Sequence, residues 1–259
     1  MIKLRITLFV LIVLFQLKLN AQELSKPTFI KSANKMTVVP SLSSRTKLIP
    51  APVNLGEAKD KKSGKNKVVY GKGLPNGNDA LINKTTNSPV HKGRTPSLVF
   101  DAVNSASEPT DPAGAVGPNH YISVFNTGFR IFDKLGNPLT GQLATDNIFP
   151  ENGCCDLTCS YDTQAQRFVM TFLGNGVQVA ISQTSDPITD GWYVYNFPMN
   201  TDYQKLSIWS DGYYLTANKD GDTAGITEVV YALERAKMLV GDTTAQIIGF
   251  PLPGIITGG

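Results

Sequence analysis

The fold is decided by the stretch Asp111–Ile122, DPAGAVGPNHYI, a turn that opens directly into an alternating apolar run. Its prolines have a fixed φ and its glycines accept a positive φ, so the backbone bends at a defined place. The run His120–Asn126 then alternates along its length and is rich in β-branched and aromatic residues, which is typical of a β-strand. After Thr127-Gly128, a second alternating run, Phe129–Asp133, ends at another turn. The stretch therefore predicts a strand, a tight connection and a second strand.

Two later units repeat this pattern of a polar turn followed by strands. Their expected strands are, in order, Arg167–Leu173, Val177–Ser182, Trp192–Phe197, Tyr213–Asn218, Glu228–Leu233 and Ala245–Phe250. The equivalent residues Tyr121, Phe168 and Tyr214 lie 47 and 46 positions apart, a period that fits four-stranded propeller blades. The sequence predicts an all-β, β-propeller-like domain over residues 98–259, with about three four-stranded blades of an incomplete ring. We expect the missing C-terminal blades in the same longer chain, and self-assembly is the alternative.

The first 97 residues predict two segments that precede this domain. Lys3 and Arg5 stand before the apolar run Ile6–Phe15, which is too short to cross about 30 Å of hydrocarbon comfortably. Residues 1–21 therefore read as a signal peptide cleaved after Ala21, so the protein is expected outside the cell or on its outer surface, with no membrane span. Residues 22–97 carry 14 basic and 4 acidic side chains, against 7 and 17 in residues 98–259. They predict a basic, low-order leader.

The three cysteines fall within six residues, at Cys154, Cys155 and Cys159. In an oxidising compartment they predict one short disulfide with one thiol left over, or unpaired, partly buried thiols. Both are favoured over a zinc cluster, because His91 and His120 are distant in sequence. No metal site is predicted.

Five residues are candidates for ligand binding: Asp111, His120, Asp162, Trp192 and Asp211. For these aspartates, and also for Asp156 and Asp186, the competing interpretation is that each carboxylate caps turn amides just before a strand. His120 is interpreted first as a hydrogen-bonded structural residue at a strand start. Trp192 belongs to a set that could stack on sugars or pack between blades, Trp192, Tyr193, Tyr195, Trp209, Tyr213 and Tyr214.

No catalytic residue and no cofactor are predicted from motifs. Nucleophile turns, phosphate loops and zinc-protease helices are missing from the sequence. The acidic run from Asn218 has Thr223 and Val229 where an EF-hand loop needs glycine at its sixth and glutamate at its twelfth position. Calcium is left open only as a ligand of several aspartates that converge on one face.

Four motifs in this order resemble a family of large secreted bacterial proteins with propeller-like domains. They are Asp111–Tyr121, Tyr161-Asp162 with Arg167-Phe168, Ser182–Pro187 with Trp192, and Asp202-Tyr203 running into Trp209–Tyr214. The resemblance covers residues 98–250, and it implies export, a propeller and often a C-terminal cell-surface sorting domain. It implies no established reaction. The chain departs from the family at Cys154–Cys159, where an acidic turn followed by proline and apolar residues is expected.

Two function classes follow from these observations. The first is a secreted or cell-surface binding or adhesion module whose ligand is an extracellular glycan or protein. The second is a polysaccharide-active enzyme, a glycoside hydrolase or lyase, on a propeller scaffold. Nucleic acid is not expected as a partner, because the basic leader has no interleaved aromatic residues. Binding ranks first, since fold analogy alone is a weak argument for catalysis.

Overall fold

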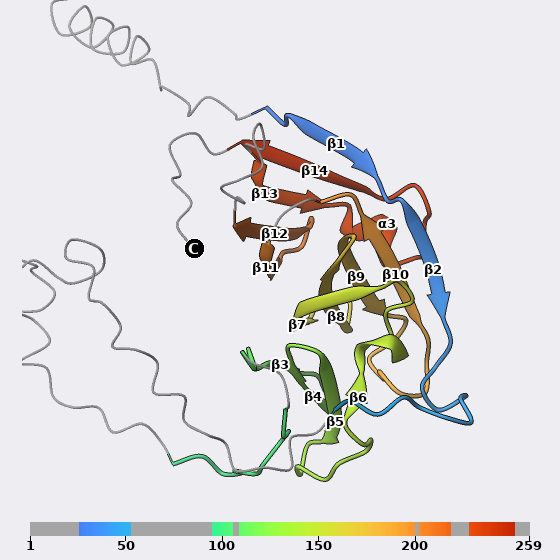
Figure 1. Ribbon diagram of the computed structural model, residues 1–259, viewed down its shortest axis with the longest axis vertical. Helices are drawn as coiled ribbons and strands as arrows, with labels where there is room; N and C mark the ends of the chain where they lie inside the picture. The colour runs from blue at the N-terminus through green and yellow to red at the C-terminus, as the bar shows by residue number, and fades with distance from the viewer. Residues whose placement is uncertain (1–25, 53–94, 106–108, 200–201, 219–227, 252–259) are drawn as a thin grey trace, which may run out of the picture.

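The computed structural model describes residues 26–52, 95–105, 109–199, 202–218 and 228–251. The chain is all-β, with three sheets of antiparallel strands that succeed one another in space (Figure 1). The predicted signal peptide, residues 53–94 of the predicted leader and most of the acidic run after Asn218 lie outside the described residues. Within the described ranges, no helix is long and apolar enough to cross a membrane.

Each sheet begins with a new stretch of chain and adds its next strands in sequence order. The first sheet consists of β3 (Ala113–Val116), β4 (His120–Phe125), β5 (Gly128–Asp133) and β6 (Leu143–Ala144). The middle sheet contains β7 (Gly153–Asp162), β8 (Arg167–Gly174), β9 (Gly176–Ser182) and β10 (Trp192–Phe197). The third sheet contains β11 (Asp202–Ile208), β12 (Tyr213–Asn218), β13 (Glu228–Leu233) and β14 (Gln246–Pro251). Two short helical segments, η1 (Thr145–Asn147) and α3 (Arg235–Met238), connect strands.

The positions used to align the sequence are also equivalent in space. Tyr121, Phe168 and Tyr214 are each the second residue of the second strand in their sheets. The predicted hairpin at the start of the domain is present, because β4 and β5 pair from His120 with Asp133 to Phe125 with Gly128. The first strand of the middle sheet, β7, lies against both β3 and β11. The three first strands are therefore neighbours.

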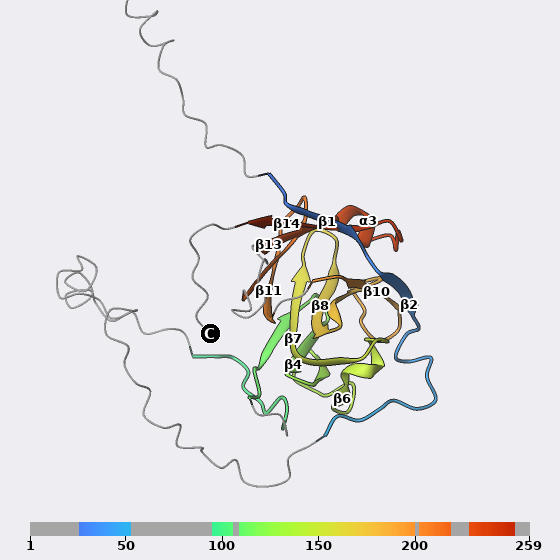
Figure 2. The ribbon, with the colours of Figure 1, turned by 45° about the horizontal axis from the view of Figure 1, so that its top comes forward.

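The expectation of a low-order leader is wrong for its described N-terminal part. Residues 26–52, here called the strap, form β1 (Phe29–Ser32) and β2 (Lys35–Val39). β1 pairs with β14 at the edge of the third sheet, and β2 pairs with β10 at the edge of the middle sheet. Pro50 then bridges to Leu143 of the first sheet, so the strap follows the outer rim of all three (Figure 2). Amino-acid composition does not reveal such a segment, because the segment is ordered by backbone hydrogen bonds to a free sheet edge and needs few apolar residues.

The core lies between the sheets, and the middle sheet contributes to both halves of it. Phe168, Met170 and Phe172 of β8 point into the cluster shared with the first sheet. Val169 and Leu173, on the other face, join the cluster shared with the third sheet. This follows from the two-residue period of a strand. The middle sheet is thus covered on both faces.

Candidate functional site

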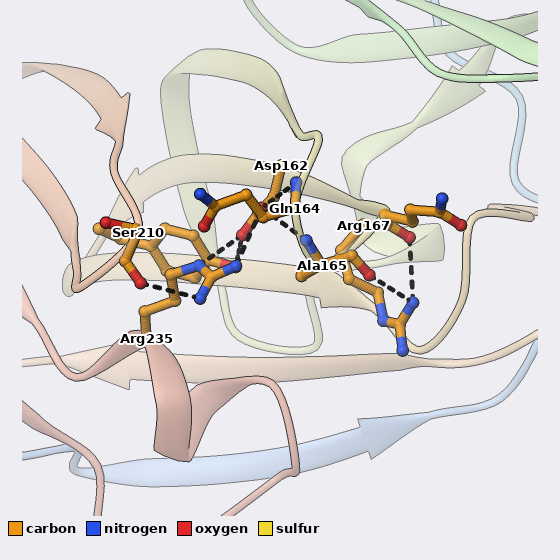
Figure 3. Close-up of polar contacts among 8 residues, drawn as sticks. Asp162, Gln164, Ala165, Arg167, Ser210 and Arg235 are labelled. Carbon is orange, nitrogen blue, oxygen red and sulfur yellow. Dashed lines mark hydrogen bonds and ion pairs between the residues drawn. The ribbon is translucent and has the colours of Figure 1, made fainter.

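Asp162, at the end of β7, is the most heavily bonded carboxylate in the described part of the chain. It is 1% exposed and lies where the middle and third sheets meet. The guanidinium of Arg235 binds both of its oxygens, with Nε 2.6 Å from Oδ2 and Nη2 3.1 Å from Oδ1 (Figure 3). The Tyr213 hydroxyl donates to Oδ2 at 2.9 Å, and the amides of Gln164 and Ala165 donate to Oδ1 at 3.1 and 2.9 Å. Five hydrogen bonds therefore fix one carboxylate.

These contacts keep Asp162 ionised. Burial raises the pKa of Asp162, but hydrogen bonds from Arg235, Ala165 and Tyr213 outweigh burial and leave the pKa below its usual value. The pKa of Arg235 is raised, first of all by its hydrogen bond to Asp162. Arg235 also donates to the carbonyl of Ser210 at 3.1 Å. We call Asp162, Tyr213, Ser210 and Arg235 the sheet tie, because they join a turn of the middle sheet to two segments of the third.

A pocket of about 210 Å³ opens beside the sheet tie and is here called the junction pocket. It is lined by Asp162, Thr163, Gln164, Ile208, Trp209 and Ser210. Trp209 follows β11 and is 70% exposed, whereas Thr163 and Gln164 are exposed polar residues of the β7–β8 turn. The pocket therefore combines an open indole ring with polar side chains.

The start of each sheet carries a residue with left-handed backbone. Asp111, Asp156 and Tyr203 have φ of 44°, 59° and 53°. Each stands two positions before the residue at which regular pairing with the second strand begins, namely Ala113, Thr158 and Lys205. Aspartate enters this region more readily than most side chains, and tyrosine does not. The three sheets thus begin with the same local bend.

The three bends meet at a second pocket, of about 220 Å³, here called the inner-strand pocket. Its lining comprises Asp111, Pro112, Ala113, Asp156, Leu157, Thr158, Tyr203 and Lys205. Asn126 Oδ1 accepts a hydrogen bond from the Asp156 amide, and Gln204 Nε2 donates to the Asp156 carbonyl at 2.6 Å. The Lys205 ammonium lies 3.4 Å from the centroid of the Tyr203 ring. Two carboxylates and one amine therefore line the pocket.

The five residues predicted to bind ligand do not form one site. Asp111 lines the inner-strand pocket, whereas Asp162 lines the junction pocket. The Trp192 side chain is fully buried and offers no surface to a sugar. His120 is the first residue of β4, and its side chain is 13% exposed, with Nε2 3.9 Å from Asp186 Oδ1. Asp211 is exposed beside Tyr214, to which it is hydrogen bonded.

The alternative to ligand binding, in which an aspartate carboxylate caps the backbone amides of a turn, is confirmed for two aspartates. Asp162 accepts the amide hydrogens of the turn after β7, and Asp186 accepts those of Ile188 and Thr189. Burial raises the pKa of Asp186, and these backbone bonds lower it to a net value below the usual range.

The cysteines form a disulfide between the neighbours Cys154 and Cys155. Cys159 is a buried free thiol, and its burial raises its pKa. One short disulfide with one thiol left over is among the arrangements expected from the sequence. Among the described residues, no three side chains of the histidine, cysteine, aspartate or glutamate type are placed to hold a metal ion.

Sequence reasoning missed the partners of the predicted residues. Arg235 lies 73 positions from Asp162 and was not singled out, although it is the one arginine in the third sheet's part of the sequence. Lys205 was also missed, and Tyr203 was named only in a family motif, because nothing in their residue types marks a left-handed bend. Trp209 was named within the aromatic set and in a family motif but not among the ligand-binding candidates, and its place outside the strands is the signal for its exposure.

Comparison with known proteins adds no assignment. The chain matches no protein-family model, and no curated protein is significantly similar to it.

Proposed function

We propose that this protein is a secreted β-propeller module that binds an extracellular glycan, and that its three sheets are consecutive blades. The blade arrangement is supported by sheets that each add strands in sequence order, with their first strands side by side. Secretion is supported by the sequence of residues 1–21 alone.

Trp209 carries the proposal for the ligand class. Of the tryptophans, Trp192 is fully buried and Trp209 is 70% exposed at a pocket. An indole ring offers a large apolar face with a polar edge, which suits the C–H face of a pyranose. Thr163, Gln164 and Ser210 supply hydroxyl, amide and carbonyl groups beside that ring. An open aromatic ring flanked by hydrogen-bonding groups is the chemistry that recognises sugar hydroxyls and ring faces together.

The same pocket argues against catalysis at that place. A general acid or base exchanges a proton with the substrate and needs a pKa near the working pH. Both oxygens of Asp162 already accept hydrogen bonds, and its pKa is lowered rather than raised. The one carboxylate in the junction pocket therefore supports the structure, and binding without cleavage is the function that the pocket supports best.

The test compares two exposed apolar residues. Trp209→Ala and Leu135→Ala both remove an exposed side chain, but Leu135 lies in the turn after β5 and lines neither the junction pocket nor the inner-strand pocket. Binding is measured against immobilised neutral and uronate-containing polysaccharides. We expect Trp209→Ala to weaken binding at least tenfold with an unchanged melting temperature, and Leu135→Ala to bind normally. Equal binding by the wild type and Trp209→Ala, or no polysaccharide bound by the wild type, would overturn the proposal.

A specific observation keeps the polysaccharide-active enzyme as a second candidate. Asp111 and Asp156 come from successive sheets and line the same inner-strand pocket. Glycosidases use two carboxylates that face one cleft. Release of reducing sugar that is lost in Asp111→Asn or Asp156→Asn, while the melting temperature is kept, would favour the enzyme over the binding module.

A further inference from the structure

The one charged side chain that lines the junction pocket is already saturated with hydrogen bonds. Asp162 is the acidic residue of the lining, and none of the lining residues is a lysine, an arginine or a histidine. Its carboxylate accepts five hydrogen bonds, whereas two carboxylate oxygens offer about four lone-pair sites. Asp162 therefore has no capacity left to accept a hydrogen bond from a sugar hydroxyl.

Arg235, which pairs with this carboxylate, is engaged as well. Its side chain is 12% exposed, and its guanidinium donates to both oxygens of Asp162 and to the carbonyl of Ser210 (Figure 3). Arg167, at the start of β8, donates to two carbonyls of the preceding turn and does not line the pocket. The junction pocket therefore offers no unpaired positive charge to an anionic ligand.

The remaining polar groups of the junction pocket are uncharged. They belong to Thr163, Gln164 and Ser210, which are exposed. Among the described residues, the side chains of these three have no hydrogen-bond partner. Hydroxyl and carboxamide groups both donate and accept hydrogen bonds, and so do the hydroxyls of a sugar. With Trp209 and Ile208 as apolar contacts, the lining suits a ring that carries hydroxyls and no charge.

The size of the junction pocket limits what enters it to about one sugar residue. Its volume of about 210 Å³ is below the roughly 300 to 1,000 Å³ of pockets that enclose a drug-sized ligand. Trp209 is 70% exposed, so the neighbouring residues of a bound polysaccharide stay in solvent. The charge of the single enclosed residue then decides whether the polysaccharide binds.

We propose that the junction pocket binds a sugar residue without an acidic group and discriminates against uronates. The inference rests on the glycan binding proposed above and names the class of glycan. A carboxylate that enters the pocket gives up water without gaining an opposite charge, and burial of an unpaired charge is costly. The 17 acidic and 7 basic side chains of residues 98–259 add repulsion at longer range.

The test compares polysaccharides that differ in charge alone. A polygalacturonate and a polymannuronate are each compared with their carboxyl-reduced form, which keeps the same linkages and has no charge. We expect the full chain to bind a carboxyl-reduced polymer at least tenfold more tightly than its parent. Added salt should narrow this difference, because it screens the repulsion of the parent polymer. Trp209→Ala should weaken binding of the preferred polymer, which assigns the discrimination to the junction pocket.

A lysine in the junction pocket should remove the discrimination. Gln164→Lys adds an ammonium group to the lining, at an exposed position. Gln166→Lys is the matched control, because it adds the same charge to an exposed position of the same turn outside the lining. We expect Gln164→Lys to bind the parent polyuronate at least tenfold more tightly than the wild type does, and Gln166→Lys to bind it as the wild type does. Thermal unfolding checks that both variants fold.

Three results would overturn the inference. They are equal or tighter binding of the polyuronates by the wild type, equal gains from Gln164→Lys and Gln166→Lys, and no binding of any of the four polymers. Tighter binding of a polyuronate that is lost in Trp209→Ala would reject the non-acidic class and leave the glycan-binding function intact. Failure of the wild type to bind these four polymers or any other polysaccharide would overturn the proposed function as well.

Discussion

Replacing Asp162 by asparagine tests the sheet tie directly. Asparagine has one acceptor oxygen for five hydrogen bonds, and its amide hydrogens face the donors of Arg235 and Tyr213. Removing one partner of a buried ion pair costs about 3 to 5 kcal/mol, because the other charge is left buried and unpaired. At about 2 to 4 °C per kcal/mol for a domain of this size, the melting temperature should fall by about 6 to 20 °C. The measurement is denaturant unfolding followed by tryptophan fluorescence, with a thermal melt as a second probe.

Two further variants decide whether the loss comes from the pair. Asp211→Asn changes an exposed aspartate of the neighbouring turn and should alter the unfolding free energy by less than about 0.5 kcal/mol. Asp162→Asn combined with Arg235→Met should cost less than the sum of the single changes by about 0.5 to 3 kcal/mol. A cost below about 1 kcal/mol for Asp162→Asn, or strict additivity in the double variant, would refute the reasoning.

Two more predictions concern acid stability and the strap. The pKa of Asp162 in the folded chain is below its unfolded value of about 3.9, so around this pH the unfolded chain binds more protons at Asp162 than the folded chain does. The stability that the ionised Asp162 contributes is therefore present above about pH 4 and is lost as the pH falls through the folded pKa. Denaturant unfolding at a series of acidic pH values should give a shallower loss for Asp162→Asn than for the wild type, and identical slopes would contradict the assignment. In the strap, Leu42→Ala should cost about 2 to 5 kcal/mol because Leu42 is 2% exposed in the core. Ile49→Ala, at 47% exposure, should cost less than about 0.5 kcal/mol, and equal small effects in urea unfolding would show that the strap is not part of the folded unit.

The strands could be predicted from the sequence because turns and alternation are local signals. β8 begins at Arg167, as expected, and β10 and β12 have the expected bounds. The strap could not be found in this way. Its pairing partners are β14 and β10, which are remote in sequence, and β1 contains a single half-buried residue. Pairing through backbone hydrogen bonds to an edge strand depends only weakly on which residue types the segment contains.

The two tryptophans illustrate why the site was only partly predicted. A strand at the surface of a sandwich buries alternate residues, but the middle sheet is covered on both faces. Trp192 and Val194 of β10 are therefore buried on one side, and Tyr195 and Phe197 of the same strand are fully buried as well. Sequence periodicity cannot distinguish a doubly covered strand from a half-exposed one without knowing its neighbours. Trp209 lies outside a strand, and its exposure follows from the turn that holds it.

The choice between binding and catalysis now depends on Asp111 and Asp156 rather than on Asp162. Their left-handed backbone explains an aspartate at each position without any function, because aspartate and asparagine both enter this region more readily than most residues. If backbone conformation is the only reason for the carboxylates, asparagine should replace either one with little change in stability or in any activity. Tyr203 occupies the equivalent position in the third sheet with φ of 53°, so the bend itself does not require a carboxylate. If Asp111→Asn or Asp156→Asn changes polysaccharide turnover at unchanged stability, the change is therefore due to loss of the negative charge, because asparagine also adopts the left-handed backbone of the bend.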